Sequence, residues 1–174
     1  GYYVTRKYDG EFALLVLEGK QAFVERYAFG SAFWQQRTVE DAPEVAAQLK
    51  SRQKDLAEYF HAQAQKDKKP EDYAAAARWY RAMLDSFPQD AEAPATRYLF
   101  AEVLFESARF AEAAKEYERT AYDYPLHAKS AAAGYAALVA YDKHEATIIG
   151  ESKALWHRQS IESALMFATS FPEH

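Results

Sequence analysis

The sequence contains no cysteine. Disulfides, thiolate chemistry and cysteine-based zinc or iron–sulfur sites are therefore excluded. Basic residues are also few, since 21 Lys and Arg stand against 26 Asp and Glu, the formal net charge is -5, and the longest basic run is the short KDKK at 66–69. Because binding to nucleic acid requires a concentrated basic face, we do not expect nucleic acid as a partner.

Long apolar runs and catalytic motifs are missing as well. The longest apolar run is FALLVL at 12–17, far shorter than the roughly 20 residues that span a bilayer, so no membrane span is predicted. No glycine-rich phosphate loop occurs, the serines lack the glycines of a nucleophile elbow, and His144-Glu145 has no second His one turn later. The five histidines are scattered. We therefore predict a protein that is not an enzyme and holds no metal or cofactor.

What is present favours helix. The 174 residues are 49% hydrophobic and 27% charged, which is ordinary for a globular domain or a compact array of repeats. Helix-forming residues dominate and only six glycines occur, so an all-α fold is expected. The chain begins with Gly and has no basic-then-apolar leader, which predicts a mature or excised form, and removal of a signal or lipid anchor is compatible with this.

Two stretches 37 residues apart have the same pattern. They are YAAAARWYRAMLDSFP from Tyr73 and FAEAAKEYERTAYDYP from Phe110. In each, apolar residues recur at three-and-four spacing, which predicts a helix with one buried face. Pro88 and Pro125 end the two stretches. The recurrence indicates a repeated structural unit.

The unit is predicted to be a helical hairpin, because a further apolar helix lies between the two stretches and breaks at 107–109. Carrying the spacing along the chain places hairpins at about 43–87, 91–124 and 127–172. Asp41 and Glu44 suggest a capping box that opens the first of these helices, which should run to about Gln65. Pro125 and Pro172 are 47 residues apart, so ten additional residues near 144–153 form either a longer loop or a longer helix.

Residues 1–40 fit the repeat less well and are interpreted as an atypical helical leader to an array at 41–174. Residues 2–7 are expected to be extended. Asp9 is expected to cap a helix over about 10–28, and Phe33-Trp34 suggests a short apolar patch.

The repeat resembles the tetratricopeptide repeat (TPR), with a small residue in the first helix, an aromatic residue opening the second, Ala three residues later, an aromatic four after that and a closing Pro. These roles fall on Ala57, Tyr73, Ala76, Tyr80 and Pro88, then on Ala101, Phe110, Ala113, Tyr117 and Pro125, and in the third hairpin on Leu138 and Pro172 alone. The segments FPQDAEAP and YLFAEVLFE are similar to TPR proteins of the Gram-negative envelope, of the β-barrel assembly lipoprotein and Tol-Pal coordinator type.

The resemblance implies a right-handed superhelix whose first helices line a partner-binding surface. By register from Ala57, Ala101 and Leu138, the residues on that surface are Lys54, Glu58, His61, Tyr98, Glu102, Phe105, Glu106, Tyr135, Val139 and Asp142. The set mixes acids with aromatics, which favours a basic or apolar extended segment, or a helix, as the bound partner. The alternative for Tyr98, Phe105 and Tyr135 is that they only pack between hairpins.

Three functions are consistent with this pattern. The first is a non-catalytic scaffold for protein–protein interaction, located in the periplasm or at the outer membrane of a bacterium. The second is the helical accessory region of a larger envelope enzyme, such as one that cleaves peptidoglycan. The third is a homo-oligomer formed through the apolar ends of the array.

Overall fold

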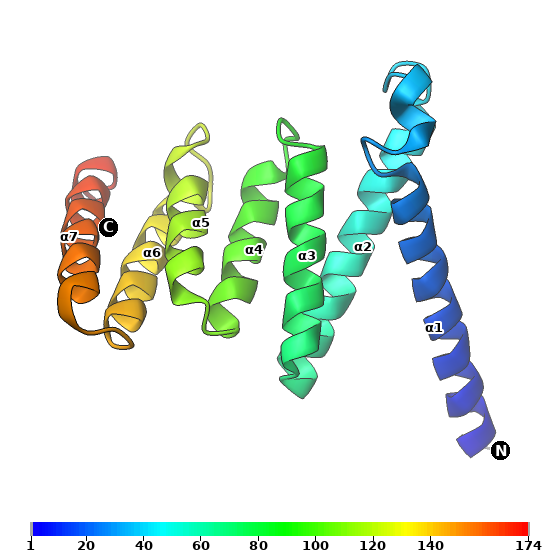
Figure 1. Ribbon diagram of the computed structural model, residues 1–174, viewed down its shortest axis with the longest axis horizontal. Helices are drawn as coiled ribbons and strands as arrows, with labels where there is room; N and C mark the ends of the chain where they lie inside the picture. The colour runs from blue at the N-terminus through cyan, green and yellow to red at the C-terminus, as the bar shows by residue number, and fades with distance from the viewer. Residues whose placement is uncertain (1, 174) are drawn as a thin grey trace.

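The computed structural model describes residues 2–173, and their side chains from Leu15 onward. This part of the chain contains seven α-helices, one short 3-10 helix and no strand (Figure 1), which confirms the all-α prediction. The elements are α1 (Tyr2–Tyr27), η1 (Ala32–Gln36), α2 (Pro43–Asp67), α3 (Pro70–Ser86), α4 (Ala93–Glu106), α5 (Phe110–Tyr122), α6 (Ser130–Glu145) and α7 (Gly150–Ser170).

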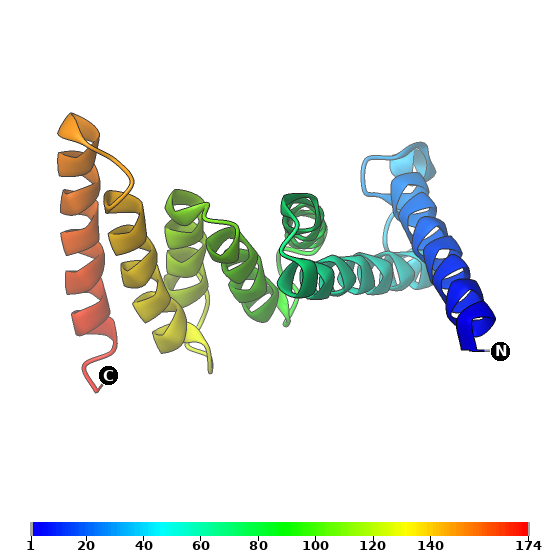
Figure 2. The same ribbon diagram turned by 90° about the horizontal axis from the view of Figure 1, so that it is seen from below.

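The helices form an elongated array in chain order. Each helix packs chiefly on the helix before it and the helix after it, and the two ends of the chain lie at opposite ends of the array (Figures 1 and 2). No helix within residues 2–173 combines the length and the apolar character needed to cross a bilayer, as the sequence predicted.

The 37-residue recurrence is visible in the packing. Five positions of α3 and the five positions 37 residues later in α5 are all buried: Ala76, Ala77, Tyr80, Met83 and Leu84, and then Ala113, Ala114, Tyr117, Thr120 and Ala121. The same offset relates the buried positions of α4 to those of α6, for example Phe100 to Ala137 and Leu104 to Tyr141. Leu138 is an exception, because it is half-buried where its counterpart Ala101 is fully buried.

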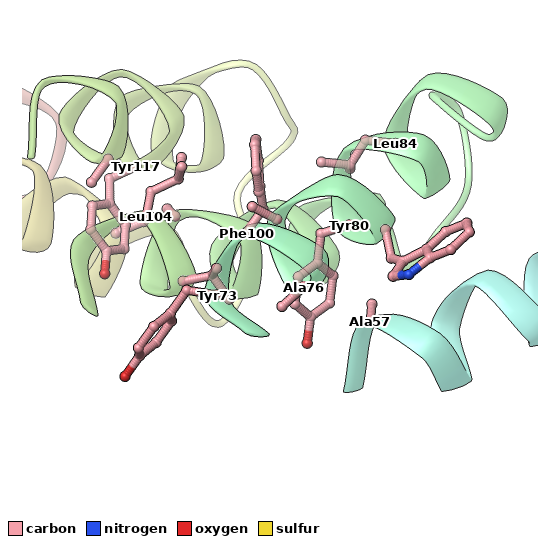
Figure 3. Close-up of a cluster of buried hydrophobic side chains, with 14 of the residues drawn as sticks. Ala57, Tyr73, Ala76, Tyr80, Leu84, Phe100, Leu104 and Tyr117 are labelled. Carbon is pink, nitrogen blue, oxygen red and sulfur yellow. The ribbon is translucent and has the colours of Figure 1, made fainter. Parts of the chain in front are cut away.

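The core combines small residues with aromatic ones. Ala57, Ala76 and Ala101 are fully buried and let neighbouring helices approach closely, while aromatic rings fill the spaces between them (Figure 3). Tyr80 and Phe100 are 2% exposed. One hairpin cannot bury both of its faces, so the unit is stable only when it recurs.

Proline marks the starts of three of the seven helices described. Pro43, Pro70 and Pro94 lie in the first turn of α2, α3 and α4, where the missing N–H would have no partner within the helix. Lys68 ends α2 in the left-handed conformation, with φ of 55°. Most of the ten additional residues of the third hairpin lengthen α7, which has 21 residues against 13 in α5, and α6 has 16 residues against 14 in α4.

Three predictions for the first 45 residues were wrong. Residues 2–7 are helical rather than extended, and α1 begins at Tyr2 and not near Gly10. No proline interrupts this segment, and a single glycine costs a helix only about 1 kcal/mol, so the helix continues through Gly10.

The predicted capping box at the start of α2 is also absent. The cap residue is Ala42, and the Asp41 carboxylate instead accepts hydrogen bonds from the Thr38 backbone N–H at 2.8 Å and the Thr38 hydroxyl at 3.0 Å. Asp41 therefore closes the preceding turn. The patch predicted at Phe33-Trp34 lies in η1, where the Trp34 ring packs against Phe29, with ring centroids 5.0 Å apart.

Candidate functional site

The ten residues predicted to bind a partner lie on α2, α4 and α6, the first helices of the three hairpins. We call the surface formed by these ten residues the first-helix surface. Glu58, Glu106, Tyr135 and Asp142 are exposed, whereas Lys54, Tyr98, Glu102, Phe105 and Val139 are half-buried. His61 is only 7% exposed and belongs to the core rather than to the surface.

His61 joins three helices. Its Nδ1 lies 3.3 Å from the Tyr80 hydroxyl of α3, and its Nε2 lies 3.4 Å from the Glu106 carboxylate of α4. Gln65 donates a hydrogen bond of 2.9 Å to Glu106. The structure thus brings the predicted residues of α2 and α4 together, and it fixes the Glu106 carboxylate at their junction.

A matching arrangement surrounds Glu102, whose carboxylate accepts a hydrogen bond from the buried Tyr117 hydroxyl of α5. The rings of Tyr98 and Phe105 pack edge-on against the Tyr117 ring, with centroids 5.7 and 6.5 Å away. These contacts join the two helices of one hairpin, and Tyr98 and Phe105 are each half-buried. The contacts do not show the packing between hairpins that the alternative interpretation predicted.

The tyrosines of the second helices reach through to this surface. In Figure 3 the hydroxyls of Tyr73, Tyr80 and Tyr117 point toward the same side of the array. Burial, reinforced by nearby carboxylate charges, raises the pKa of Tyr80, and burial together with the hydrogen bond to Glu102 raises the pKa of Tyr117. Both phenols stay neutral at pH 7, so they add no negative charge to that of the carboxylates.

Three carboxylates dominate the α2 and α4 part of the first-helix surface. Glu58 and Glu102 occupy equivalent places on α2 and α4, and Glu106 follows Glu102 one turn later. Lys54 does not neutralise them, because its ammonium group contacts Glu92 at 3.3 Å. In the third hairpin Val139 replaces the equivalent glutamate, so Asp142, two turns after Tyr135, is the single carboxylate that α6 contributes to this surface.

Around Tyr135, the α6 part of the first-helix surface is apolar and contains a pocket. An open pocket of about 910 Å³ lies beside Tyr135, whose side chain is 61% exposed. It is lined by Leu126, His127, Ala128, Ala131, Ala132, Tyr135, Phe167 and Phe171. This volume falls within the range of about 300–1,000 Å³ that is common for ligand sites.

The wall of this pocket carries no charged side chain. The ring of His127 accepts a hydrogen bond at Nδ1 from the Lys129 N–H at 3.2 Å, and Nε2 lies 2.9 Å from the Thr120 carbonyl. With Nδ1 accepting, Nε2 donates to the carbonyl, so both ring nitrogens bond to backbone groups. The chemistry of the pocket is therefore that of an apolar side chain's binding site.

Sequence reasoning identified only Tyr135 among the residues of the pocket. Phe167 and Phe171 come from α7 and its end, and they correspond to Thr120 and Tyr124 only under the 47-residue spacing of the last two prolines. Aligning α7 with α5 by the 47-residue spacing would have placed these two aromatic residues in the third hairpin from the sequence alone.

The acidic and apolar parts are adjacent. The Lys129 ammonium group lies 4.9 Å from the centre of the Tyr98 ring, and Lys129 follows Ala128 of the pocket wall.

No cluster of three or more His, Asp or Glu side chains suited to a metal ion occurs among the side chains described. Comparisons of the chain with models of protein families, with curated proteins and with solved structures found no match.

Proposed function

We propose that this protein is a non-catalytic scaffold that binds a segment of another protein on the first-helix surface, and that its hairpins form a right-handed superhelix of the TPR type. The observation that carries the proposal is the open apolar pocket beside Tyr135, next to a surface where Glu102 and Glu106 are held by hydrogen bonds. An apolar pocket and fixed charges for orientation are what recognition of a peptide segment needs.

The bound segment combines basic and apolar side chains. Glu102 accepts its hydrogen bond from a phenol and Glu106 accepts one from an amide, so neither hydrogen bond comes from a cation. Charge-assisted hydrogen bonds from Lys or Arg of a partner would be favourable there. An apolar side chain of the same segment would fill the pocket and bury Tyr135.

The test replaces Tyr98, in the acidic part of the first-helix surface, and Tyr135, beside the apolar pocket. Peptides selected from a displayed random library on the immobilised wild-type protein supply the probe, and fluorescence anisotropy gives the dissociation constant. Tyr98→Ala combined with Tyr135→Ala should weaken binding about 30-fold or more, because buried aromatic anchors at interfaces contribute more than 1 kcal/mol each. Circular dichroism should show unchanged helix content.

The matched control is Asp85→Ala, which changes an exposed side chain on α3. This variant should bind the selected peptides as the wild type does. Equal affinity of the double variant and the wild type would reject the first-helix surface as the binding site. Selection of peptides without basic residues would reject the role of the carboxylates.

A further inference from the structure

The outer side of α7 carries a stripe of exposed residues at alternating spacings of four and three. We call Ala154, Arg158, Ile161, Leu165 and Ala168 the α7 stripe. All five are exposed, including Ile161 at 49% and Leu165 at 65%. The opposite side of α7 contains the buried Ser163 and the half-buried Trp156 and Phe167, and α7 packs chiefly on α6. Alternation of three and four is the spacing of residues that pack helix against helix.

In α5, the second helix of the preceding hairpin, the side that corresponds to the α7 stripe packs against other helices. Under the 47-residue spacing of Pro125 and Pro172, Ile161 corresponds to Ala114 and Leu165 corresponds to Glu118. In α5 the first of these is fully buried, and the second accepts a hydrogen bond of 3.2 Å from Tyr141 of the next helix, α6. The α7 stripe thus lies where α5 meets its following neighbour.

The stripe is complementary to itself when two copies of α7 run antiparallel. Leu165 and Ala154 lie at nearly equal distances on either side of the middle of α7, near residue 160, and so do Arg158 and Glu162. An antiparallel alignment that places Leu165 over Ala154 of the second copy therefore also places Arg158 beside Glu162 of the second copy. The large side chain of Leu165 then lies against the small side chain of Ala154, and the cationic Arg158 lies beside the anionic Glu162. Neither charged residue forms an ion pair among the side chains described.

We propose that two copies of this protein associate through their α7 stripes as a symmetric antiparallel dimer. The same surface on both copies provides the contact, so the assembly closes at two chains. The interface consists of one helix from each copy, which places it among the small and weak class with dissociation constants on the order of micromolar. It does not involve the pocket beside Tyr135.

Sedimentation velocity at protein concentrations from about 1 to 200 μM tests the proposal, because this range brackets a micromolar dissociation constant. The wild type should shift from monomer to dimer across it. Leu165→Glu should raise the dissociation constant at least about tenfold, since it places two carboxylates in an apolar contact. The mutated side chain is already mostly exposed, so the fold should be retained, and circular dichroism checks this.

A charge exchange tests the alignment itself. Arg158→Glu alone and Glu162→Arg alone should each weaken the dimer, and the double variant should restore it. Leu126→Glu, which changes an even more exposed leucine outside the stripe, should leave the dimer unchanged, as should the Tyr98 and Tyr135 double variant. A wild type that stays monomeric at about 200 μM, or a dimer that survives Leu165→Glu, would overturn the proposal. A double charge variant that remains monomeric would overturn the antiparallel alignment.

Discussion

Gly134 of α6 lies against the ring of Phe167 of α7. A Cβ atom added at Gly134 would come within 2.8 Å of Phe167 Cδ2 and within 3.1 Å of the Tyr122 hydroxyl of α5. Three helices therefore meet at a point where only a glycine fits. The equivalent positions in the earlier hairpins hold Gln53 and Arg97, so the third hairpin is packed more closely here than the other two.

Gly134→Ala is expected to destabilise the protein by about 1 kcal/mol. Alanine improves helix propensity by roughly 1 kcal/mol, but overpacking a close contact costs about 1–3 kcal/mol, so the loss is larger. Gly19→Ala in α1 is the matched control, because nothing lies within 4 Å of the added carbon. It should stabilise the protein by about 0.5–1 kcal/mol. Urea denaturation gives both values, and equal stabilisation by the two changes would contradict the contact.

Arg97 is predicted to be the most sensitive charged residue of the core. It is 8% exposed, its Nη1 lies 2.5 Å from the Glu116 carboxylate, and its Nε donates to the Tyr124 hydroxyl at 2.9 Å. Arg97→Met should lower the free energy of unfolding by about 2 kcal/mol, because it leaves the half-buried Glu116 carboxylate with only the more distant Arg119, at 3.3 Å, as a cationic partner.

Adding Glu116→Leu to Arg97→Met should recover much of that loss, since the carboxylate that has lost its closest partner is then removed. A double-mutant cycle from urea denaturation measures the coupling. If the two losses simply added, the pair would not be coupled in the folded state.

Alkaline pH is expected to unfold the protein through its buried tyrosines. Burial raises the pKa of Tyr80, Tyr117 and Tyr141. The unfolded chain loses these protons above about pH 10, whereas the folded chain keeps them, so stability is complete below pH 10 and falls as pH rises. The slope is about 1.4 kcal/mol per pH unit for each tyrosine.

Tyr117→Phe should reduce that slope by the share of one tyrosine. Urea denaturation between about pH 9 and 11.5 gives the slope, and tyrosinate absorbance should rise together with the loss of helix. Complete ionisation of the tyrosines while the circular dichroism stays native would show that these phenols are accessible in the folded protein.

Lowering the pH is expected to weaken the interactions of Asp90 in the turn between α3 and α4, and so to destabilise the protein. Asp90 accepts a hydrogen bond of 2.6 Å from Lys50, which lowers the pKa of the Asp90 carboxyl, and it also accepts the Glu92 N–H at 2.8 Å. The stabilisation is present above the unfolded pKa of about 3.9 and is lost as pH falls through the lower folded pKa.

Asp90→Asn should therefore cost about 0.5–1 kcal/mol at pH 7 and close to nothing near pH 2. Urea denaturation at both pH values measures the difference. Asp85→Asn on the exposed side of α3 is the control and should be neutral at both. A cost for Asp90→Asn that does not change with pH would assign the effect to the turn rather than to the ion pair.

The sequence predicted the helices best where an apolar stripe and a proline coincide, as in α3 and α5. The predictions were wrong where the chain adopts a different local interaction or conformation from the one expected. Asp41 bonds to Thr38 instead of capping α2, and residues 2–7 contain no residue that excludes a helix. The TPR-type superhelix and the envelope location that the resemblance implies remain predictions.

The candidate site was harder to predict than the fold. His61 has surface spacing but is buried, because Tyr80 of α3 and Glu106 of α4 surround it, and neither contact is visible from α2 alone. The pocket beside Tyr135 needs Phe167, which lies 32 residues away. Contacts across the array depend on the stacking of whole hairpins, which local periodicity does not specify.

The arrangement of helices that touch only their neighbours has a consequence for how the molecule opens. No part of the array encloses another, so α7 can separate from α6 without disturbing the contacts between α2 and α3. Protection of backbone amides from hydrogen exchange should therefore be graded along the chain, highest in α3 to α5 and lowest toward the two ends.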